Sequence, residues 1–124
     1  MNLNQVTLAV PDVVRAIPFY QKLGLTLIVH THDDYARFEC PDGESTFSIH
    51  TGEGGGGAIT YFEVDDVDLE FHRLQKQGIR FEHPPTDQRW LWREARLADP
   101  GGNQLIIYSA GENRKNPPWR QKGV

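Results

Sequence analysis

The chain has 124 residues, of which 38% are hydrophobic and 10% aromatic, and it carries a formal net charge of −4 and a single cysteine, Cys40. A chain of this length can hold the core of one domain, no apolar run approaches the roughly 18 residues of a membrane span, and one cysteine excludes an internal disulfide. A single cysteine is typical of proteins in a reducing compartment, so we expect a cytoplasmic protein. An acidic balance argues against nucleic-acid binding, and we expect neither nucleic-acid nor membrane partners.

The first half of the chain predicts a strand, a helix and three further strands. Alternating apolar residues predict a strand at 3–10, and Gln5 is a polar residue within it. Asp12 is the expected N-cap of a helix that ends at Gly24, and we expect a kink at Pro18 because proline cannot donate the helical hydrogen bond. Period-two segments predict strands at 25–31, 35–40 and 45–51, with a CPDG turn at 40–43.

The second half predicts the same order after a glycine-rich stretch, GEGGGG, at 52–57, which has the composition of a flexible linker. A helix capped by Asp66 extends to Gly78, with Phe71 flanking its apolar side. Strands are expected at 58–64, 79–82, 91–98 and 104–108, with a DPGG turn at 99–102.

The repeated order of elements indicates an internal duplication. LNQVTLAVPD matches AITYFEVDD when Val10 is aligned with Val64. YARFECPDG matches EARLADPGG when Pro41 is aligned with Pro100. Agreement in both order and spacing is a stronger signal than any single motif.

Three segments carry a resemblance to a known family: VTLAVPDVVRAIPFYQKLGL, YFEVDDVDLEFHRLQKQGIRF and WREARLADPGGNQLIIY. Together they resemble the vicinal oxygen chelate (VOC) superfamily of glyoxalase I, bleomycin- and fosfomycin-resistance proteins and extradiol dioxygenases. The resemblance covers about residues 1–109. It implies an α+β fold in which two βαβββ modules form curved half-sheets around a cleft, often in a homodimer. We therefore expect one VOC domain at 1–110 (module one 1–51, linker 52–57, module two 58–110) and a basic extension at 111–124.

In metal-dependent members of this family, four inward side chains hold a divalent ion. The resemblance carries these positions onto Gln5, Ser48, Ile59 and Ile106, with His50 as a substitute for Ser48 on the same face. Glutamine occurs as a ligand at the first position in some glyoxalases, but isoleucine cannot coordinate a metal. A catalytic divalent ion needs at least three protein ligands. We therefore expect a degenerate site without a metal or other cofactor, and a bound divalent metal is the alternative.

Strand alternation also predicts which side chains line the cleft expected from the resemblance. The other interpretation of these positions is that several are solvent-exposed ends of the sheet. The ligand-binding candidates are Gln5, Thr7, Arg37, Ser48, His50, Tyr61, Glu63, Trp92, Arg96 and Tyr108.

Two of these residues have an additional chemical interpretation. His50 is a candidate general base near neutral pH, or a half-exposed strand residue. Glu63 is the other catalytic candidate, and Arg96 or Arg37 is its expected partner. Such a pair would either bind a polar substrate or form a structural salt bridge between strands.

The tail and the tryptophans add apolar and charged surface. Four basic residues and one acidic residue in 112–124 give this segment a net charge of +3, so the body carries −7. We expect Trp119 to anchor the tail onto the body or onto a partner subunit, and one of Trp90 and Trp92 to face the core.

Two main functions remain open at this point. The first is a small-molecule-binding protein of the glyoxalase/bleomycin-resistance type, which sequesters a polar or aromatic compound and whose acidic body fits a cationic ligand. The second is an enzyme, either a metal-dependent lyase or dioxygenase of the glyoxalase family or a metal-free acid–base enzyme that uses His50 and Glu63. The resemblance implies a homodimer in either case.

Overall fold

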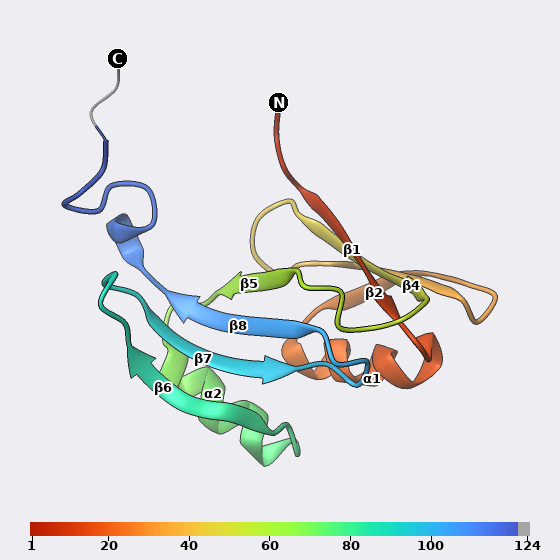
Figure 1. The fold of residues 1–124 in the computed structure, drawn as a ribbon. Helices are drawn as coiled ribbons and strands as arrows, with labels where there is room; N and C mark the ends of the chain where they lie inside the picture. The colour runs from red at the N-terminus through yellow and green to blue at the C-terminus, as the bar shows by residue number, and fades with distance from the viewer. Residues whose placement is uncertain (122–124) are drawn as a thin grey trace. The chain divides into compact units, whose positions relative to one another are not determined.

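The computed structural model describes residues 1–121 and contains the same order of elements twice (Figure 1). A strand, a helix and three strands are followed by another strand, helix and three strands, so the expected α+β fold of two βαβββ modules is confirmed. The elements are β1 (Gln5–Val10), α1 (Val13–Leu23), β2 (Thr26–Thr31), β3 (Tyr35–Glu39), β4 (Thr46–Thr51), β5 (Ile59–Glu63), α2 (Val67–Lys76), β6 (Phe81–Asp87), β7 (Arg93–Ala98), β8 (Gln104–Ser109) and the 3₁₀ turn η1 (Gly111–Asn113).

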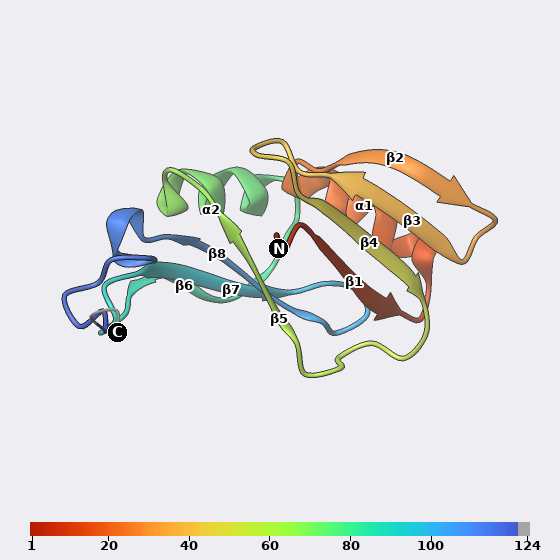
Figure 2. The same ribbon diagram turned by 90° about the horizontal axis from the view of Figure 1, so that it is seen from above.

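The strands form two four-stranded sheets, with the orders β1-β4-β3-β2 and β5-β8-β7-β6. In each sheet, the first and last strands of a module are neighbours, and the β1–β4 pair is parallel. Figure 2 shows one helix lying against one face of each sheet. None of the helices within the described part of the chain is long and apolar enough to cross a membrane.

Helix α1 begins and ends where the capping residues predict. The Asp12 carboxylate accepts a 3.0 Å hydrogen bond from the Arg15 backbone N–H, and Gly24 ends the helix with a left-handed φ of 109°. The helix continues through Pro18 as a single segment. Pro18 leaves the Val14 carbonyl without its helical donor, but both residues are exposed, so water can take that place.

Helix α2 is capped by Asp66, whose carboxylate accepts from the Leu69 N–H at 3.0 Å. Phe71, expected at the flank of the apolar side, is in fact buried together with Val67 and Leu74. These three positions share one face at helical spacing. The Phe71 ring lies 4.7 Å from that of Phe81, centroid to centroid, and this contact draws Phe71 inward.

Strand β6 differs from the expected strand at 79–82. It runs from Phe81 to Asp87 and contains Pro84 and Pro85. Two consecutive prolines argue against a strand interior, but β6 is at the edge of its sheet, where one side needs no ladder partner. Its pairing with β7 is interrupted by register shifts on both sides of His83.

The chain divides into two compact units that do not coincide with the two halves of the sequence. Unit 1 comprises residues 1–59 and 98–104, and unit 2 comprises 60–97 and the chain from 105 onward. The turn between β7 and β8 thus belongs to unit 1. There Tyr20, whose ring packs 4.7 Å from that of Phe47, donates a hydrogen bond to Asp99.

The glycine-rich stretch is held in unit 1 by close packing. A Cβ added to Gly54 would lie 1.8 Å from the carbonyl oxygen of Gly101, which no side chain tolerates. Next to it, the Gly55 N–H donates to the Asn103 side chain at 3.0 Å. This part of 52–57 is therefore positioned by contacts, and glycine is needed there for close backbone approach.

Candidate functional site

The face of the unit 1 sheet that points away from α1 carries polar side chains. The β1–β4 register places Thr7 opposite Ser48, and the antiparallel β3–β4 register places Arg37 opposite Ser48. Strand alternation sends the intervening Phe47 and Ile49 into the core. We call the hydrogen-bonded group on this face the polar network, which consists of Gln5, Thr7, Tyr35, Arg37, Thr46 and Ser48.

Gln5 lies at one end of the polar network. Its Nε2 group donates to Ser48 Oγ at 2.9 Å and is within 3.1 Å of both Thr7 Oγ1 and the Val6 carbonyl oxygen. Its Oε1 atom accepts from the Thr46 hydroxyl. The Gln5 amide is therefore hydrogen-bonded to protein groups through both its nitrogen and its oxygen.

Tyr35 and Arg37 form the other end of the network. Arg37 Nε donates to the Tyr35 hydroxyl at 2.9 Å, and that hydroxyl is 2.9 Å from Ser48 Oγ. The hydrogen bond with Ser48, and then that with the Arg37 guanidinium and its charge, lower the pKa of Tyr35. The candidate set from the sequence omitted Tyr35 and Thr46, although the period-two step from Ser48 to Thr46 could have identified the latter.

The residues carried over as metal ligands do not fit a divalent ion. Ile59 and Ile106 have no donor atom, and the Gln5 amide is engaged by hydroxyl groups. His50 is exposed, and its Nδ1 lies 2.9 Å from the Thr51 carbonyl, outside the polar network. Within residues 1–121, no three His, Cys, Asp or Glu side chains are grouped so that they could hold a metal ion.

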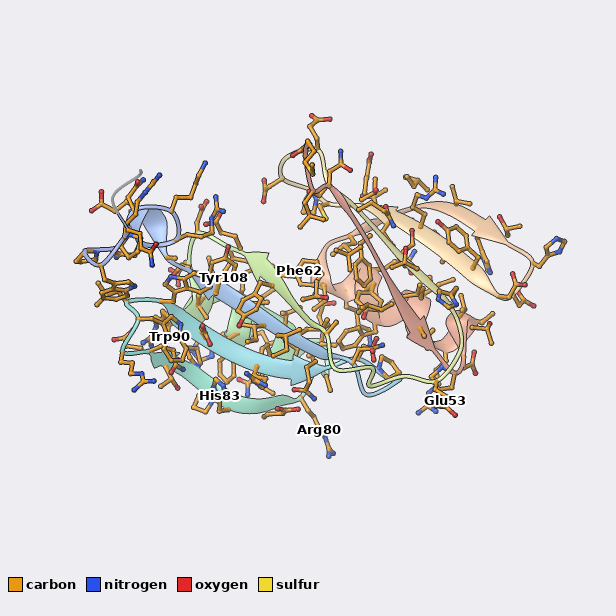
Figure 3. The ribbon with its side chains drawn as sticks, turned by 45° about the horizontal axis from the view of Figure 1, so that its top comes forward. Glu53, Phe62, Arg80, His83, Trp90 and Tyr108 are labelled. Atoms are coloured by element: carbon orange, nitrogen blue, oxygen red, sulfur yellow. The ribbon has the colours of Figure 1, made fainter. Side chains whose placement is uncertain are left out.

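The sheet of unit 2 carries an aromatic cluster, which we define as Tyr61, Trp92 and Tyr108. Trp92 stacks on Tyr108 with centroids 4.7 Å apart and an interplanar angle of 22°. Tyr61 stands edge-on to both rings, at 5.8 Å from Trp92 and 5.6 Å from Tyr108. Tyr108 lies near the arrowhead end of β8 (Figure 3).

The cluster rests on apolar residues in β8 and directly after it. Ile106 and Ala110 are buried with Tyr108, and Trp92 packs against them. Burial, together with the nearby negative charge of Glu63, raises the pKa of Tyr108. Trp92 is thus the tryptophan that faces a packed cluster, whereas Trp90 is 38% exposed in the loop between β6 and β7 (Figure 3).

A pocket of about 600 Å³ lies at the end of the same sheet, next to Trp92. One wall is Arg93, whose guanidinium is fixed by Asp68 at 2.8 Å and Asp87 at 2.9 Å. Another is Leu91, a non-glycine residue with a left-handed φ of 69°. The pocket lining comprises Asp65, Asp87, Gln88, Leu91, Trp92, Arg93, Ser109, Ala110, Gly111 and Asn113.

The remaining charged candidates are divided between the two units. Glu63 and Arg96, which both belong to unit 2, form no ion pair with each other among the described residues, and Arg37 belongs to unit 1. His50 belongs to unit 1 and Glu63 to unit 2. Sequence reasoning did not single out the buried acid of unit 2, Glu94, which accepts a 2.9 Å hydrogen bond from the Trp90 indole.

The family model of the "Glyoxalase/Bleomycin resistance protein/Dioxygenase superfamily" matches residues 2–107. Among curated proteins, the "Uncharacterized protein YraH" of Bacillus subtilis (strain 168) is 29% identical over an alignment of 126 residues. The alignment covers 87% of this chain and 98% of that protein.

Solved structures show the same fold. A glyoxalase/bleomycin resistance protein/dioxygenase from Nocardioides superposes with a TM-score of 0.78 at 21% identity, covering 98% of this chain and 90% of that one. A lactoylglutathione lyase from Agrobacterium tumefaciens gives a TM-score of 0.73 at 18% identity, covering 87% and 92% of the two chains. At these identities the likeness establishes the fold alone.

Proposed function

This chain belongs to the glyoxalase/bleomycin resistance protein/dioxygenase superfamily, and we propose that within it the protein binds a small polar or aromatic molecule without using a metal ion. The observation that carries the proposal is the aromatic cluster of unit 2. Its three rings are on the sheet face where strand alternation predicts ligand contacts, and Tyr61 is 44% exposed.

The geometry of the cluster suits a planar ligand. Trp92 and Tyr108 hold each other by stacking, and the Trp92 indole N–H is tied at 3.3 Å to the Asn113 carbonyl. Tyr61 stands on this fixed base, so little side-chain entropy is lost when a ring packs against it. A rigid, half-exposed tyrosine is therefore a ready contact for an aromatic or otherwise planar compound.

Binding without a metal is supported by the donor set. Two of the four positions implied by the family are isoleucines, and the amide at the first position is already hydrogen-bonded on both its atoms. Neither of the enzyme alternatives gains comparable support. His50 is exposed, and among residues 1–121 its recorded hydrogen bond is to its neighbour's carbonyl; the lyase relative shares only the fold.

A titration with benzamide, followed by the aromatic NMR resonances, tests this function. We expect benzamide to shift the resonances of Tyr61 and Trp92, and we expect Tyr61→Ala to weaken its binding roughly threefold to tenfold through the lost ring contact. Trp119→Ala removes an exposed tryptophan of the tail and should leave the affinity unchanged. The proposal fails if benzamide leaves the cluster resonances unmoved and native mass spectrometry of freshly purified protein finds no bound compound.

A further inference from the structure

We propose that the buried carboxylate of Glu94 binds a cationic nitrogen group, an amidinium or a protonated amine, on the planar molecule that contacts the aromatic cluster. This inference rests on the proposed binding function and specifies the chemical class of its ligand. Glu94 and the whole aromatic cluster belong to unit 2, so the site is contained within one compact unit.

Glu94 lies on the face of the unit 2 sheet that carries the aromatic cluster. Leu97 pairs with Phe81, whose ring packs against helix α2, so Leu97 lies on the helix side of β7. Alternation from Leu97 puts Glu94 on the opposite face, together with Trp92, which precedes it by two residues. Two residues of a strand span roughly 6–7 Å, so a single substituted ring can reach from Trp92 to Glu94.

The Glu94 carboxylate is almost enclosed by protein and is held by a neutral donor. The residue is 3% exposed, and its Oε2 accepts a 2.9 Å hydrogen bond from the Trp90 indole N–H. The loop that carries Trp90 is closed by backbone hydrogen bonds, from the Gln88 N–H to the Trp92 carbonyl at 2.7 Å and from the Leu91 N–H to the Gln88 carbonyl at 2.9 Å. Trp90 therefore fixes which carboxylate oxygen is used.

The second carboxylate oxygen, Oε1, keeps its acceptor sites open. Among residues 1–121, no donor other than the Trp90 indole bonds to the Glu94 side chain, and neither Arg89 nor Arg96 pairs with it. Nor do the described residues contain any sealed-off side-chain oxygen or nitrogen that lacks a partner. Oε1 therefore belongs to the small exposed part of Glu94, where a molecule on the sheet face can reach it.

A buried carboxylate with one neutral hydrogen bond favours a cationic partner. Removing its charge from water carries a desolvation cost, which a positive group that donates hydrogen bonds offsets. Such a charge-assisted hydrogen bond is about twice as strong as a neutral one. The neighbouring Trp92 adds a ring contact for the planar part of the ligand. Arg96, two residues further along this face, is the group that would favour an anion instead, so the experiment includes one.

The test compares benzamidine with benzamide, which has nearly the same shape without the charge, and with benzoate. The full chain is labelled with ¹⁵N, and its three indole N–H resonances report on Trp90, Trp92 and Trp119. Benzamidine should shift the first two, leave that of Trp119 unmoved, and bind roughly tenfold more tightly than benzamide. Glu94→Gln keeps an acceptor for the Trp90 indole and should bind both compounds equally. Glu82→Gln, an exposed acid of β6, is the matched control and should keep the preference.

Salt separates the buried carboxylate from the acidic charge of the whole chain. In 1 M salt, exposed charges are screened beyond roughly 3 Å, whereas a buried pair is screened much less, so the preference for benzamidine should persist. A preference that disappears in salt, or that Glu82→Gln removes as fully as Glu94→Gln does, reflects long-range attraction and contradicts the role of Glu94.

The comparison of the three compounds on the unmodified chain decides the charge preference without any variant, and thermal melting shows whether each variant is folded. Equal affinity for benzamidine and benzamide, tighter binding of benzoate, or a preference that folded Glu94→Gln retains would overturn the inference. If benzamide still shifts the resonances of the aromatic cluster in any of these cases, the binding function stands and only its cationic ligand class is wrong.

Discussion

The hydroxyl of Tyr20, in α1, donates a 2.6 Å hydrogen bond to Asp99, which lies 79 residues later in the chain. Both residues are buried, and Asp99 also accepts from the backbone N–H groups of Gly101 and Asn103. The Asn103 side chain continues the network to the Ala9 carbonyl at 2.8 Å. This chain of contacts explains why residues 98–104 belong to unit 1.

Tyr20→Phe should destabilise the protein by roughly 1–3 kcal/mol, because it removes a buried hydrogen bond to a carboxylate and leaves one Asp99 oxygen with fewer donors. Burial, and then the charge of Asp99, raise the pKa of Tyr20, so the phenol stays protonated and remains a donor at every pH near neutrality. Urea unfolding measures the change. Tyr61→Phe, which removes a hydroxyl from a half-exposed ring, is the control. Equal unfolding free energies for Tyr20→Phe and the unmodified chain would contradict the assigned role.

Gly54→Ala should destabilise unit 1, since the added Cβ would lie 1.8 Å from the Gly101 carbonyl oxygen and the backbone would have to move. Gly56→Ala is the matched control two residues later, where an added Cβ meets nothing within 4 Å. That variant should keep or raise the melting temperature, with a gain of about 0.4–1 kcal/mol from the lower entropy of the unfolded chain. If both variants melt at the same temperature, the stretch is an ordinary flexible linker.

Asp68→Asn should change how stability depends on pH. Its hydrogen bonds with the Arg93 guanidinium hold the pKa of Asp68 below its ordinary value, so the ionised pair stabilises the fold above that ordinary value and the contribution is lost as the pH falls through the lowered pKa. The variant should melt at a lower temperature at neutral pH, and the difference should narrow in acid. Glu82→Gln, an exposed acid on β6, gives the baseline. A difference that stays constant from neutral to acidic pH would show that the ion pair contributes nothing.

Purified protein should contain well under one equivalent of zinc, nickel, iron or manganese by elemental analysis. The reason is the donor set, in which Ile59 and Ile106 occupy two ligand positions and Gln5 is engaged by hydroxyls. Adding these ions should neither raise the melting temperature nor produce glyoxalase activity. A stoichiometric metal whose loss on chelation lowers the melting temperature, and which Gln5→Ala abolishes, would favour the metal-dependent enzyme.

The protein should form a homodimer, as the family resemblance implies. We expect Trp119 to anchor the tail onto the body or onto a partner subunit, and its 57% exposure within one chain favours the partner subunit. Light scattering should give twice the 14.1 kDa mass of the chain. Truncation after Gly111 should weaken the dimer, with Leu69→Ala as a control at another exposed apolar side chain. A particle of 14.1 kDa at micromolar concentration would exclude the dimer.

Much of the architecture follows from local signals in the sequence. Asp12 and Asp66 begin their helices because a carboxylate can accept from a free N–H one turn later, and Gly24 ends the first because it adopts a positive φ. The repeated order of elements follows from hydrophobic periodicity, which each segment carries by itself. The same alternation correctly placed Gln5 and Ser48 on one face, because a strand has only two.

The tertiary structure decided everything that depends on distant segments meeting. Strand β6 forms through two prolines because it lies at a sheet edge, and no local pattern reveals which strand is outermost. Gly54 meets Gly101, and Tyr20 meets Asp99, only after the chain has folded back on itself. The Tyr35 hydroxyl likewise contacts Ser48 through the β3–β4 register, so the hydrogen bonds of the polar network could not be predicted from either strand alone. Capping and periodicity are set by neighbours in sequence, whereas register, close backbone approach and side-chain pairing are set by packing.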